Sequence, residues 1–194
     1  MRFTFALCSA LVALALAACS RPQPHFIGSA LTPKPAYDFT LADQHGHAFR
    51  LSSERGKAVI LFFGYTHCPD VCPATMASLR RAYDDLTPAQ RANVQVVFVT
   101  VDPERDGPRA LGRFIDTFDP SFVGLTGTEA QLAPIERAYH VFHQRIPGTR
   151  ADGGYLVAHT GAVYLIGPGG DLRVMHGWQD PPRTISADVA ALLS

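Results

Sequence analysis

Two short apolar runs in the middle of the chain restrict its fold more than any other feature. The first lies within 57–65 and includes Ala-Val-Ile-Leu-Phe-Phe, and the second spans 94–101. Both are far shorter than the roughly 20 residues of a membrane-spanning helix. They have the length and the branched and aromatic residues of strands buried on both faces. Apolar residues at helical spacing follow each run, within 73–86 and 108–118. We therefore expect an α/β fold built on a buried sheet.

The remaining pattern predicts elements that surround this sheet. Strands and helices alternate first, and an antiparallel hairpin followed by a helix ends the chain, which indicates a thioredoxin-like three-layer sandwich with a mixed sheet. The further elements are an N-terminal hairpin within 39–51, a helix at 129–140, a short strand at 141–146, a polar loop at 147–154, a hairpin of 162–166 with 172–176, and a final helix at 184–193.

Charge and composition exclude several classes of protein. The 194 residues include 17 Lys and Arg against 17 Asp and Glu, so nothing indicates a surface that neutralises phosphates, and we expect no nucleic-acid partner. With 47% hydrophobic residues the composition is that of a globular protein, and the length fits one domain. We expect this domain to be a monomer.

The N-terminus has the pattern of an export signal. Met1-Arg2 precedes an uncharged apolar stretch that ends in Leu-Ala-Ala before Cys19. This ending resembles the lipobox of bacterial lipoproteins, which implies lipid attachment at Cys19 and a domain anchored in the bacterial cell envelope, facing the periplasm. We assign 1–18 to the signal peptide, 19–35 to a proline-rich tether, and 36–194 to the domain. A plain secretory signal and an uncleaved anchor remain alternatives.

Only two cysteines then remain for the domain, Cys68 and Cys72, at the junction of a buried strand and a helix. Unpaired N–H groups at a helix start stabilise a thiolate and lower its pKa. Residues four apart on a helix have Cβ atoms about 5–6 Å apart, whereas a disulfide needs about 3.8 Å. A metal with M–S near 2.3 Å spans sulfurs up to about 4.6 Å apart. The spacing therefore suits a metal at least as well as a disulfide, and a fixed structural disulfide remains an alternative.

Three segments resemble the Sco/SenC family. They are Tyr-Thr-His-Cys-Pro-Asp-Val-Cys-Pro at 65–73, Val-Asp-Pro-Glu-Arg-Asp at 101–106, and Val-Ala-His-Thr at 157–160. The resemblance implies a thioredoxin-fold copper protein, commonly membrane-anchored, that takes part in building the binuclear copper centre of cytochrome c oxidase. It also implies that Cys68, Cys72 and His159 are the copper ligands, and that the cysteine pair is redox-active.

The donor types agree with a copper site without proving it. Two thiolates and an imidazole suit Cu(I), zinc or an iron–sulfur cluster, and structural zinc normally takes four protein ligands. Copper as Cu(I), Cu(II) or both is the expected cofactor. His159 lies 87 residues after Cys72, so the sequence alone cannot bring the two together. The family often has Asp before this histidine, whereas this chain has Ala158, which leaves the orientation of the imidazole open.

Other polar residues near these segments allow either a functional or a structural interpretation. Asp102 is a candidate for orienting the site or docking a partner, or it simply forms an Asp-Pro turn. Asp70 either tunes charge between the cysteines or starts the helix. His67 adjoins Cys68 but is kept only as a reserve ligand, because the side chains of neighbouring residues on a strand point in opposite directions. We interpret the remaining candidates as surface histidines and a packing tryptophan: His45, His47, His140, His143 and Trp178.

The leading hypothesis is a copper carrier that serves the copper-bearing subunit of cytochrome c oxidase or another copper protein. An enzymatic alternative is a thiol–disulfide reductase that keeps a partner's copper-ligand cysteines reduced and is itself restored by a periplasmic thiol reductant. The three residues between the cysteines, against two in thioredoxin-type enzymes, favour the carrier. A peroxidase fits less well, because Thr66 stands two residues before Cys68 rather than three. A pure interaction module would require a permanently oxidised pair.

Overall fold

The structure is a computed structural model that describes residues 24–148 and 154–194. Its centre is an 8-stranded mixed sheet in the order β1-β10-β9-β4-β5-β6-β2-β3. Strands β4, β5 and β6 pair in parallel, and the other neighbours pair antiparallel. The strands are β1 (Ser29–Pro35), β2 (Thr40–Asp43), β3 (Ala48–Arg50), β4 (Ala58–Gly64), β5 (Val94–Thr100), β6 (Val123–Thr126), β9 (Ala162–Ile166) and β10 (Asp171–Gly177).

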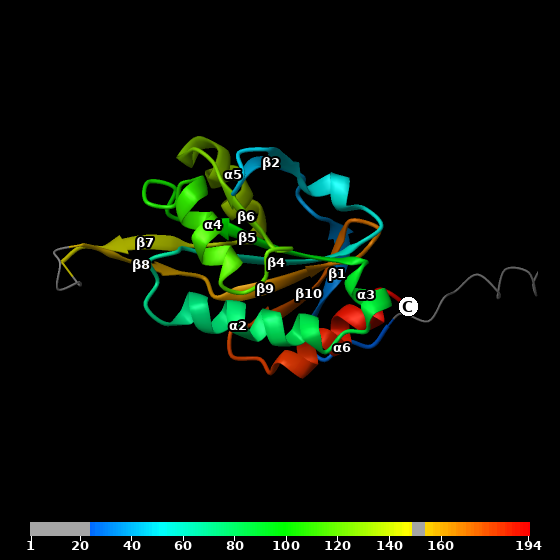
Figure 1. The fold of residues 1–194 in the computed structure, drawn as a ribbon. Coiled ribbons are helices and arrows are strands. Elements are labelled where there is room, and N and C mark those ends of the chain that lie inside the picture. The colour runs from blue at the N-terminus through cyan, green and yellow to red at the C-terminus, as the bar shows by residue number, and fades with distance from the viewer. Residues whose placement is uncertain (1–23, 149–153) are drawn as a thin grey trace, which may run out of the picture.

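Helices cover both faces of this sheet. Figure 1 shows α2 (Val71–Asp84) and α6 (Pro182–Leu192) on one face, and α4 (Pro108–Asp116) and α5 (Glu129–Tyr139) on the other. The short η1 (Leu51–Glu54) and α3 (Pro88–Arg91) lie in connections. The expected three-layer α/β fold with a mixed sheet is confirmed, and β2 and β3 form the expected N-terminal hairpin.

The central strand β4 leads directly into the segment that carries the cysteines. Every residue of β4 is buried, as expected for a strand with layers on both faces. After the strand, a short loop runs into α2, which begins at Val71, two residues earlier than predicted. Cys72 therefore lies in the first turn of α2, and Cys68 lies in the loop before it.

Residues 29–35, which proline content assigned to the tether, belong to the sheet. They form β1, which pairs antiparallel with β10 at the sheet edge. The pairing shifts register between Ala30 and Lys34, around Pro33. An edge strand tolerates proline, because only one of its sides needs ladder hydrogen bonds. In the structure, the domain therefore begins before the expected residue 36.

A second, separate sheet of two strands carries the distant histidine. β7 (His143–Ile146) and β8 (Leu156–His159) pair antiparallel, with His143 opposite His159. Figure 1 shows this ribbon projecting beyond the end of the main sheet. The sequence predicted β7 but not β8. His159 is the last residue of β8 and lies shortly before β9.

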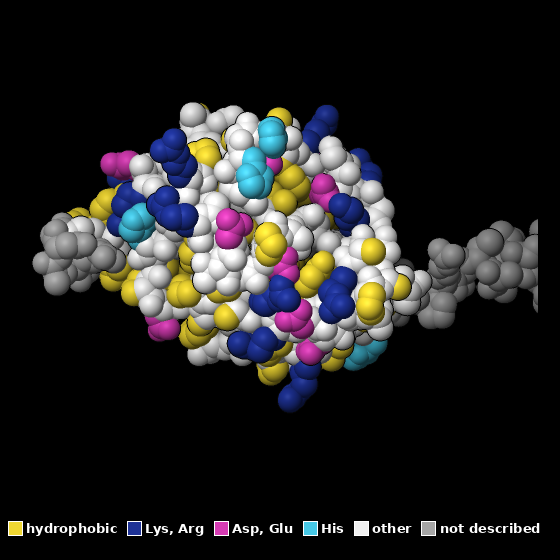
Figure 2. Space-filling view, in the orientation of Figure 1, with side chains coloured by type: hydrophobic (Ala, Val, Ile, Leu, Met, Phe, Trp, Pro, Cys, Tyr) yellow, Lys and Arg dark blue, Asp and Glu magenta, His cyan; other side chains and the backbone are white. Residues whose placement is uncertain are grey.

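The surface view agrees with the balanced charge of the chain. On the face seen in Figure 2, basic and acidic side chains are interspersed among apolar ones. Among the residues that the structure describes, no helix has the length and apolar character needed to cross a bilayer.

Candidate metal centre

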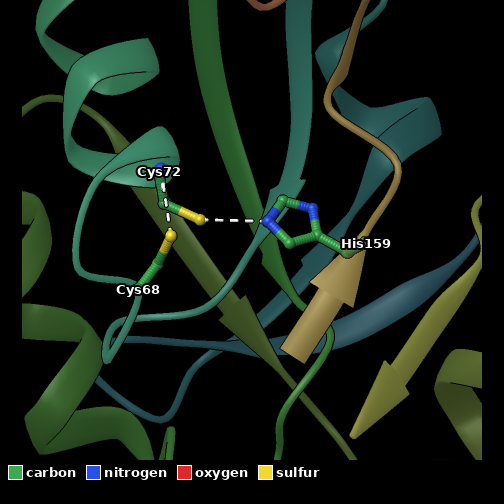
Figure 3. Close-up of side chains that lie close together, drawn as sticks. All are labelled: Cys68, Cys72 and His159. Atoms are coloured by element: carbon green, nitrogen blue, oxygen red, sulfur yellow. Dashed lines mark hydrogen bonds between the residues drawn. The ribbon is translucent and has the colours of Figure 1, made fainter. Parts of the chain in front are cut away.

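The fold brings together two neighbouring cysteines and a histidine that lies far from them in the sequence. One ligand atom from each of Cys68, Cys72 and His159 lies within 4.8 Å of the others. His159 Nε2 is 3.2 Å from Cys72 Sγ, and the Cys72 N–H donates to Cys68 Sγ over 3.3 Å. Figure 3 shows the imidazole pointing at the sulfur pair from the strand opposite. Both cysteines are free thiols.

Local sequence explains why the two sulfurs meet at this point. Asp70 is the N-cap residue of α2, but its side chain makes no capping hydrogen bond. The Cys68 sulfur takes that place by accepting from the N–H of Cys72, a donor left open at every helix start. The close approach also needs Gly64 at the end of β4, because a Cβ there would lie 3.0 Å from Cys72 Sγ and 2.8 Å from Phe98.

The two thiols differ strongly in acidity. The hydrogen bond with Cys72 lowers the pKa of Cys68 to about 3, and contacts with His159 and with the N–H groups of Cys72 and Asp70 act in the same direction. The same hydrogen bond with Cys68 raises the pKa of Cys72 far above its usual value, and burial adds to the rise. The half-buried Cys68 is therefore the thiolate, and the buried Cys72 keeps its proton in the metal-free protein.

The imidazole is oriented by the backbone. His159 Nδ1 lies 3.1 Å from the carbonyl oxygen of Thr160, so an Nδ1–H tautomer donates there and leaves the lone pair of Nε2, which faces Cys72 Sγ, available to a metal ion. The ring packs edge-on against Phe62 and Tyr65. The carbonyl thus supplies the acceptor that Ala158 lacks. Two sulfurs and one imidazole nitrogen in this arrangement fit a soft ion such as Cu(I).

The site opens to solvent through a pocket of about 350 Å³. Cys68 and His159 lie in its wall, and the side chains of Ile146 and Trp178 form part of the apolar lining. Trp178 is 39% exposed. It packs over Gly161, where a Cβ would lie 2.8 Å from the indole ring. Trp178 therefore packs against the domain, as predicted, and also lines the pocket at the site.

The other candidate residues lie away from the three ligand atoms. Asp102 is 1% exposed, and its carboxylate accepts from Tyr155 and Arg105 and bonds none of the three. Asp70 is exposed at the pocket. His67 Nδ1 is 3.5 Å from Asp106 rather than turned to the sulfurs. The four other histidines that the sequence offered as candidates lie in the β2–β3 turn (His45, His47), at the C-cap of α5 (His140) and beside Glu136 (His143).

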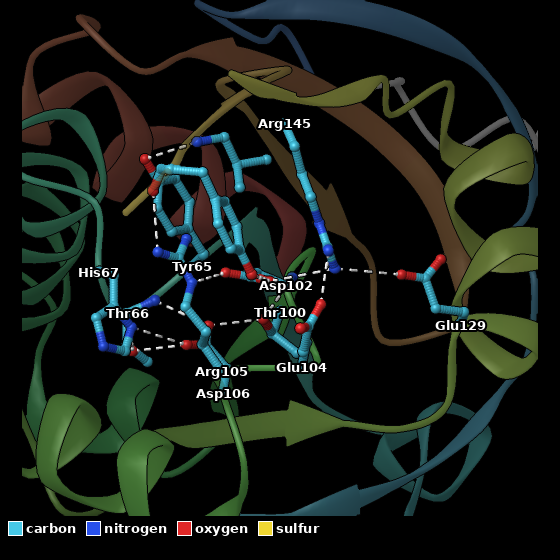
Figure 4. Close-up of polar contacts among 12 residues, drawn as sticks. Tyr65, Thr66, His67, Thr100, Asp102, Glu104, Arg105, Asp106, Glu129 and Arg145 are labelled. Atoms are coloured by element: carbon cyan, nitrogen blue, oxygen red, sulfur yellow. Dashed lines mark hydrogen bonds and ion pairs between the residues drawn. The ribbon is translucent and has the colours of Figure 1, made fainter. Parts of the chain in front are cut away.

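Sequence reasoning missed two polar groups that support the site. The buried carboxylate of Asp106 accepts from Thr66 N–H at 2.8 Å, Thr66 Oγ1 at 2.7 Å and Thr100 Oγ1 at 2.7 Å, which fixes the start of the cysteine loop. Tyr155 bonds Asp102 through its hydroxyl and stacks under the guanidinium of Arg105 at 3.6 Å. The contacts of Tyr155 join the start of β8 to the loop after β5. Figure 4 shows Arg145 of β7 reaching Asp102 and Glu104 of the same loop. The segment 101–106, which resembles a family motif, was the sequence feature that could have pointed to these supporting groups.

The fold and the site define a class: a thioredoxin-like domain with an open two-cysteine, one-histidine centre. The chain belongs to the SCO1/SenC family, whose model matches residues 29–194. It spans less than two thirds of the length of the first curated relatives it matches.

Three solved structures are similar to this chain. Apo Sco1 from Thermus thermophilus is 40% identical, with a TM-score of 0.76 over 89% of this chain and 100% of that one. Copper-bound ScoI from Bradyrhizobium japonicum is 34% identical, with a TM-score of 0.70 over 82% and 100%. BsSco, a member of the Sco family of cytochrome c oxidase assembly proteins in which a disulfide switch was identified, shares the fold at 24% identity, with a TM-score of 0.67 over 86% and 97%.

Proposed function

We propose that this chain binds one copper ion through Cys68, Cys72 and His159 and delivers it to the copper-bearing subunit of cytochrome c oxidase. The observation that carries the proposal is the approach of a remote imidazole to 3.2 Å from a sulfur of the cysteine pair. A relative of 34% identity binds copper, and another member of the family is an oxidase assembly protein.

The geometry suits a carrier better than a permanent metal store. Three protein ligands leave part of the coordination sphere of copper open, and the pocket gives a partner access to Cys68 and His159. A partner thiolate or imidazole can then bind the ion before the first ligands release it. Soft sulfur donors retain Cu(I), and the imidazole also suits Cu(II).

A titration of the reduced full-length protein with Cu(I) against a competing chelator tests this proposal. We expect one tightly bound copper per chain, with a thiolate-to-copper absorption band after loading with Cu(II). A variant with both His45→Ala and His47→Ala is the matched control, because these exposed histidines lie in the β2–β3 turn. It should bind copper as the wild type does. Substoichiometric binding by the wild type, or loss in this control, would contradict the three-ligand site.

We also propose that lipid on Cys19 anchors the domain at the cell envelope, facing the periplasm. The apolar stretch before Leu-Ala-Ala-Cys supports this. In bacteria that carry the gene, Cys19→Ser should move the protein from the membrane fraction to the aqueous fraction and remove the lipid mass from its N-terminal peptide. A membrane-bound Cys19→Ser protein that retains residues 1–18 would instead indicate an uncleaved anchor.

Thiol–disulfide exchange is a second candidate function, favoured by the unequal acidity of the two cysteines. The Cys68 thiolate would attack a partner disulfide, form a mixed disulfide and release one partner thiolate. Cys72 would then lose its proton and attack Cys68, which releases the second partner thiol and leaves a Cys68–Cys72 disulfide. Two electrons pass to the partner, and a periplasmic thiol reductant restores the pair. Exchange needs only the sulfurs, so His159→Ala separates this function from copper binding.

A further inference from the structure

The side chain of Tyr65 connects the segment that leads into the cysteine loop with the ribbon that carries His159. Tyr65 follows β4 directly and is 2% exposed. Its ring stands edge-on to the His159 imidazole, with the centroids 5.8 Å apart and the planes at 88°. The guanidinium of Arg105 lies 5.7 Å over the ring of Tyr65. Figure 4 shows Tyr65 beside the polar network that contains Asp102, Arg105 and Asp106.

The Tyr65 hydroxyl holds the backbone of β8. It accepts a hydrogen bond from the N–H of Val157 over 3.2 Å, in a buried contact two residues before His159. β8 belongs to the two-stranded ribbon and makes no ladder with the main sheet. Contacts of this kind therefore decide how close the imidazole comes to the sulfurs.

The backbone of Tyr65 contacts both cysteines. Its carbonyl accepts from the N–H of Cys68 over 3.3 Å, and its own N–H acts on the Cys72 thiol, where it opposes the rise in pKa. One residue therefore fixes the thiol loop through its main chain and the histidine strand through its side chain. A shift of either half relative to the other would require a change at Tyr65.

From these contacts we propose that Tyr65 is the positioning residue that sets the distance between His159 and the cysteine pair, and thereby the copper affinity of the site. The inference rests on the proposed copper-binding function and deepens it. The phenol does not bind the metal. It acts by holding the Val157 amide, and the ring restricts the rotation of the imidazole.

The central variant is Tyr65→Phe, which keeps the ring and removes only the hydroxyl. Loss of a group that orients a metal ligand typically costs 10–100-fold in metal affinity, and we expect roughly that loss for Cu(I) in the reduced full-length protein. The matched control is Tyr164→Phe. That buried hydroxyl donates to the carbonyl of Tyr139 over 2.6 Å, away from the three ligand side chains, and its loss should leave copper affinity unchanged.

A double-mutant cycle shows whether Tyr65 acts through His159. In a His159→Ala background, Tyr65→Phe should cause no further loss of copper affinity. In the electron paramagnetic resonance spectrum of the Cu(II)-loaded protein, the hyperfine coupling from the His159 nitrogen should change in Tyr65→Phe and stay unchanged in Tyr164→Phe. Wild-type affinity in Tyr65→Phe, or an equal loss in both backgrounds, would overturn the proposal.

Amide hydrogen exchange of the copper-free protein gives a test that does not depend on metal. Val157 should exchange faster in Tyr65→Phe than in the wild type and in Tyr164→Phe, because its N–H has lost its buried partner. An unchanged rate would overturn the positioning role even if copper affinity falls.

The exchange measurement also separates this inference from the proposed function. If the wild type failed to bind copper, the proposed function would fail, while the exchange rate of Val157 would still decide whether Tyr65 holds β8. If Tyr65→Phe does not fold, slow exchange of Val157 and a Tyr65–His159 ring contact by NMR in the wild type support the inference, and their absence refutes it.

Discussion

Replacing His159 by alanine is expected to lower the Cu(I) affinity of the reduced protein by more than about 100-fold, because it removes a donor and not only a group that orients one. The imidazole lies 3.2 Å from Cys72 Sγ and comes from the two-stranded sheet rather than from the main sheet that leads to the cysteines. Within the described residues, no other histidine belongs to the cluster. Competition with a Cu(I) chelator measures the loss.

The same variant should retain most of the thiol chemistry. Cys68 and Cys72 belong to the loop after β4 and to the first turn of α2, which His159 does not build. The control is His143→Ala, because His143 is the direct partner of His159 across the ribbon but bonds Glu136. It should bind copper as the wild type does. Native copper affinity in His159→Ala would refute the three-ligand centre, and loss of exchange together with copper binding would indicate a general disruption of the fold.

The part of the site next to the central strand could be predicted because its causes are local. An apolar run, a short polar loop and helical spacing after Pro73 fix the order strand, loop and helix in any α/β arrangement. Cysteines at the end of that loop then lie at a helix start, where open N–H groups favour a thiolate. The observed helix begins only two residues before the prediction.

The histidine could be named only through the resemblance to a family. Its distance from the thiols depends on where the β7–β8 ribbon leaves the end of the main sheet, and β8 is a 4-residue strand with a mixed burial pattern. Alternation over so few residues gives a weak strand signal. The supporting contacts are equally non-local: Asp106 reaches back 40 residues to Thr66, and Tyr65 reaches 92 residues forward to Val157. Sequence spacing carries no information about such pairs.

For β1 the prediction was wrong, because a rule based on local composition did not account for pairing with a distant strand. Proline density normally favours an extended tether. An edge position in a sheet needs hydrogen bonds on one side only, so β1 joins β10 with a register shift around Pro33. Composition could not reveal that a free edge was available, because that edge is created by β10, more than a hundred residues later.

Cys68 is expected to react with iodoacetamide at a rate that hardly changes between pH 5 and pH 8 in the reduced, copper-free protein. Its pKa is lowered to about 3, mainly by the hydrogen bond with Cys72, so the thiolate is already formed at the lower end of this range. An ordinary thiol with a pKa near 8.5 loses about tenfold in thiolate for each unit that the pH falls. The shape of the profile is the decisive readout, because a thiolate of low pKa is also a weaker nucleophile.

Cys72→Ala provides the control, since it removes the proton that stabilises the Cys68 thiolate. Its profile should fall more steeply towards pH 5 than that of the wild type. Cys72 itself should remain unlabelled in the folded wild type, because its hydrogen bond with Cys68 and its burial raise its pKa. A wild-type rate that rises tenfold per pH unit from 5 to 8 would mean that Cys68 is an ordinary thiol. One sulfur would then not be prepared for an incoming ion at neutral pH, and copper would have to displace a proton from both cysteines.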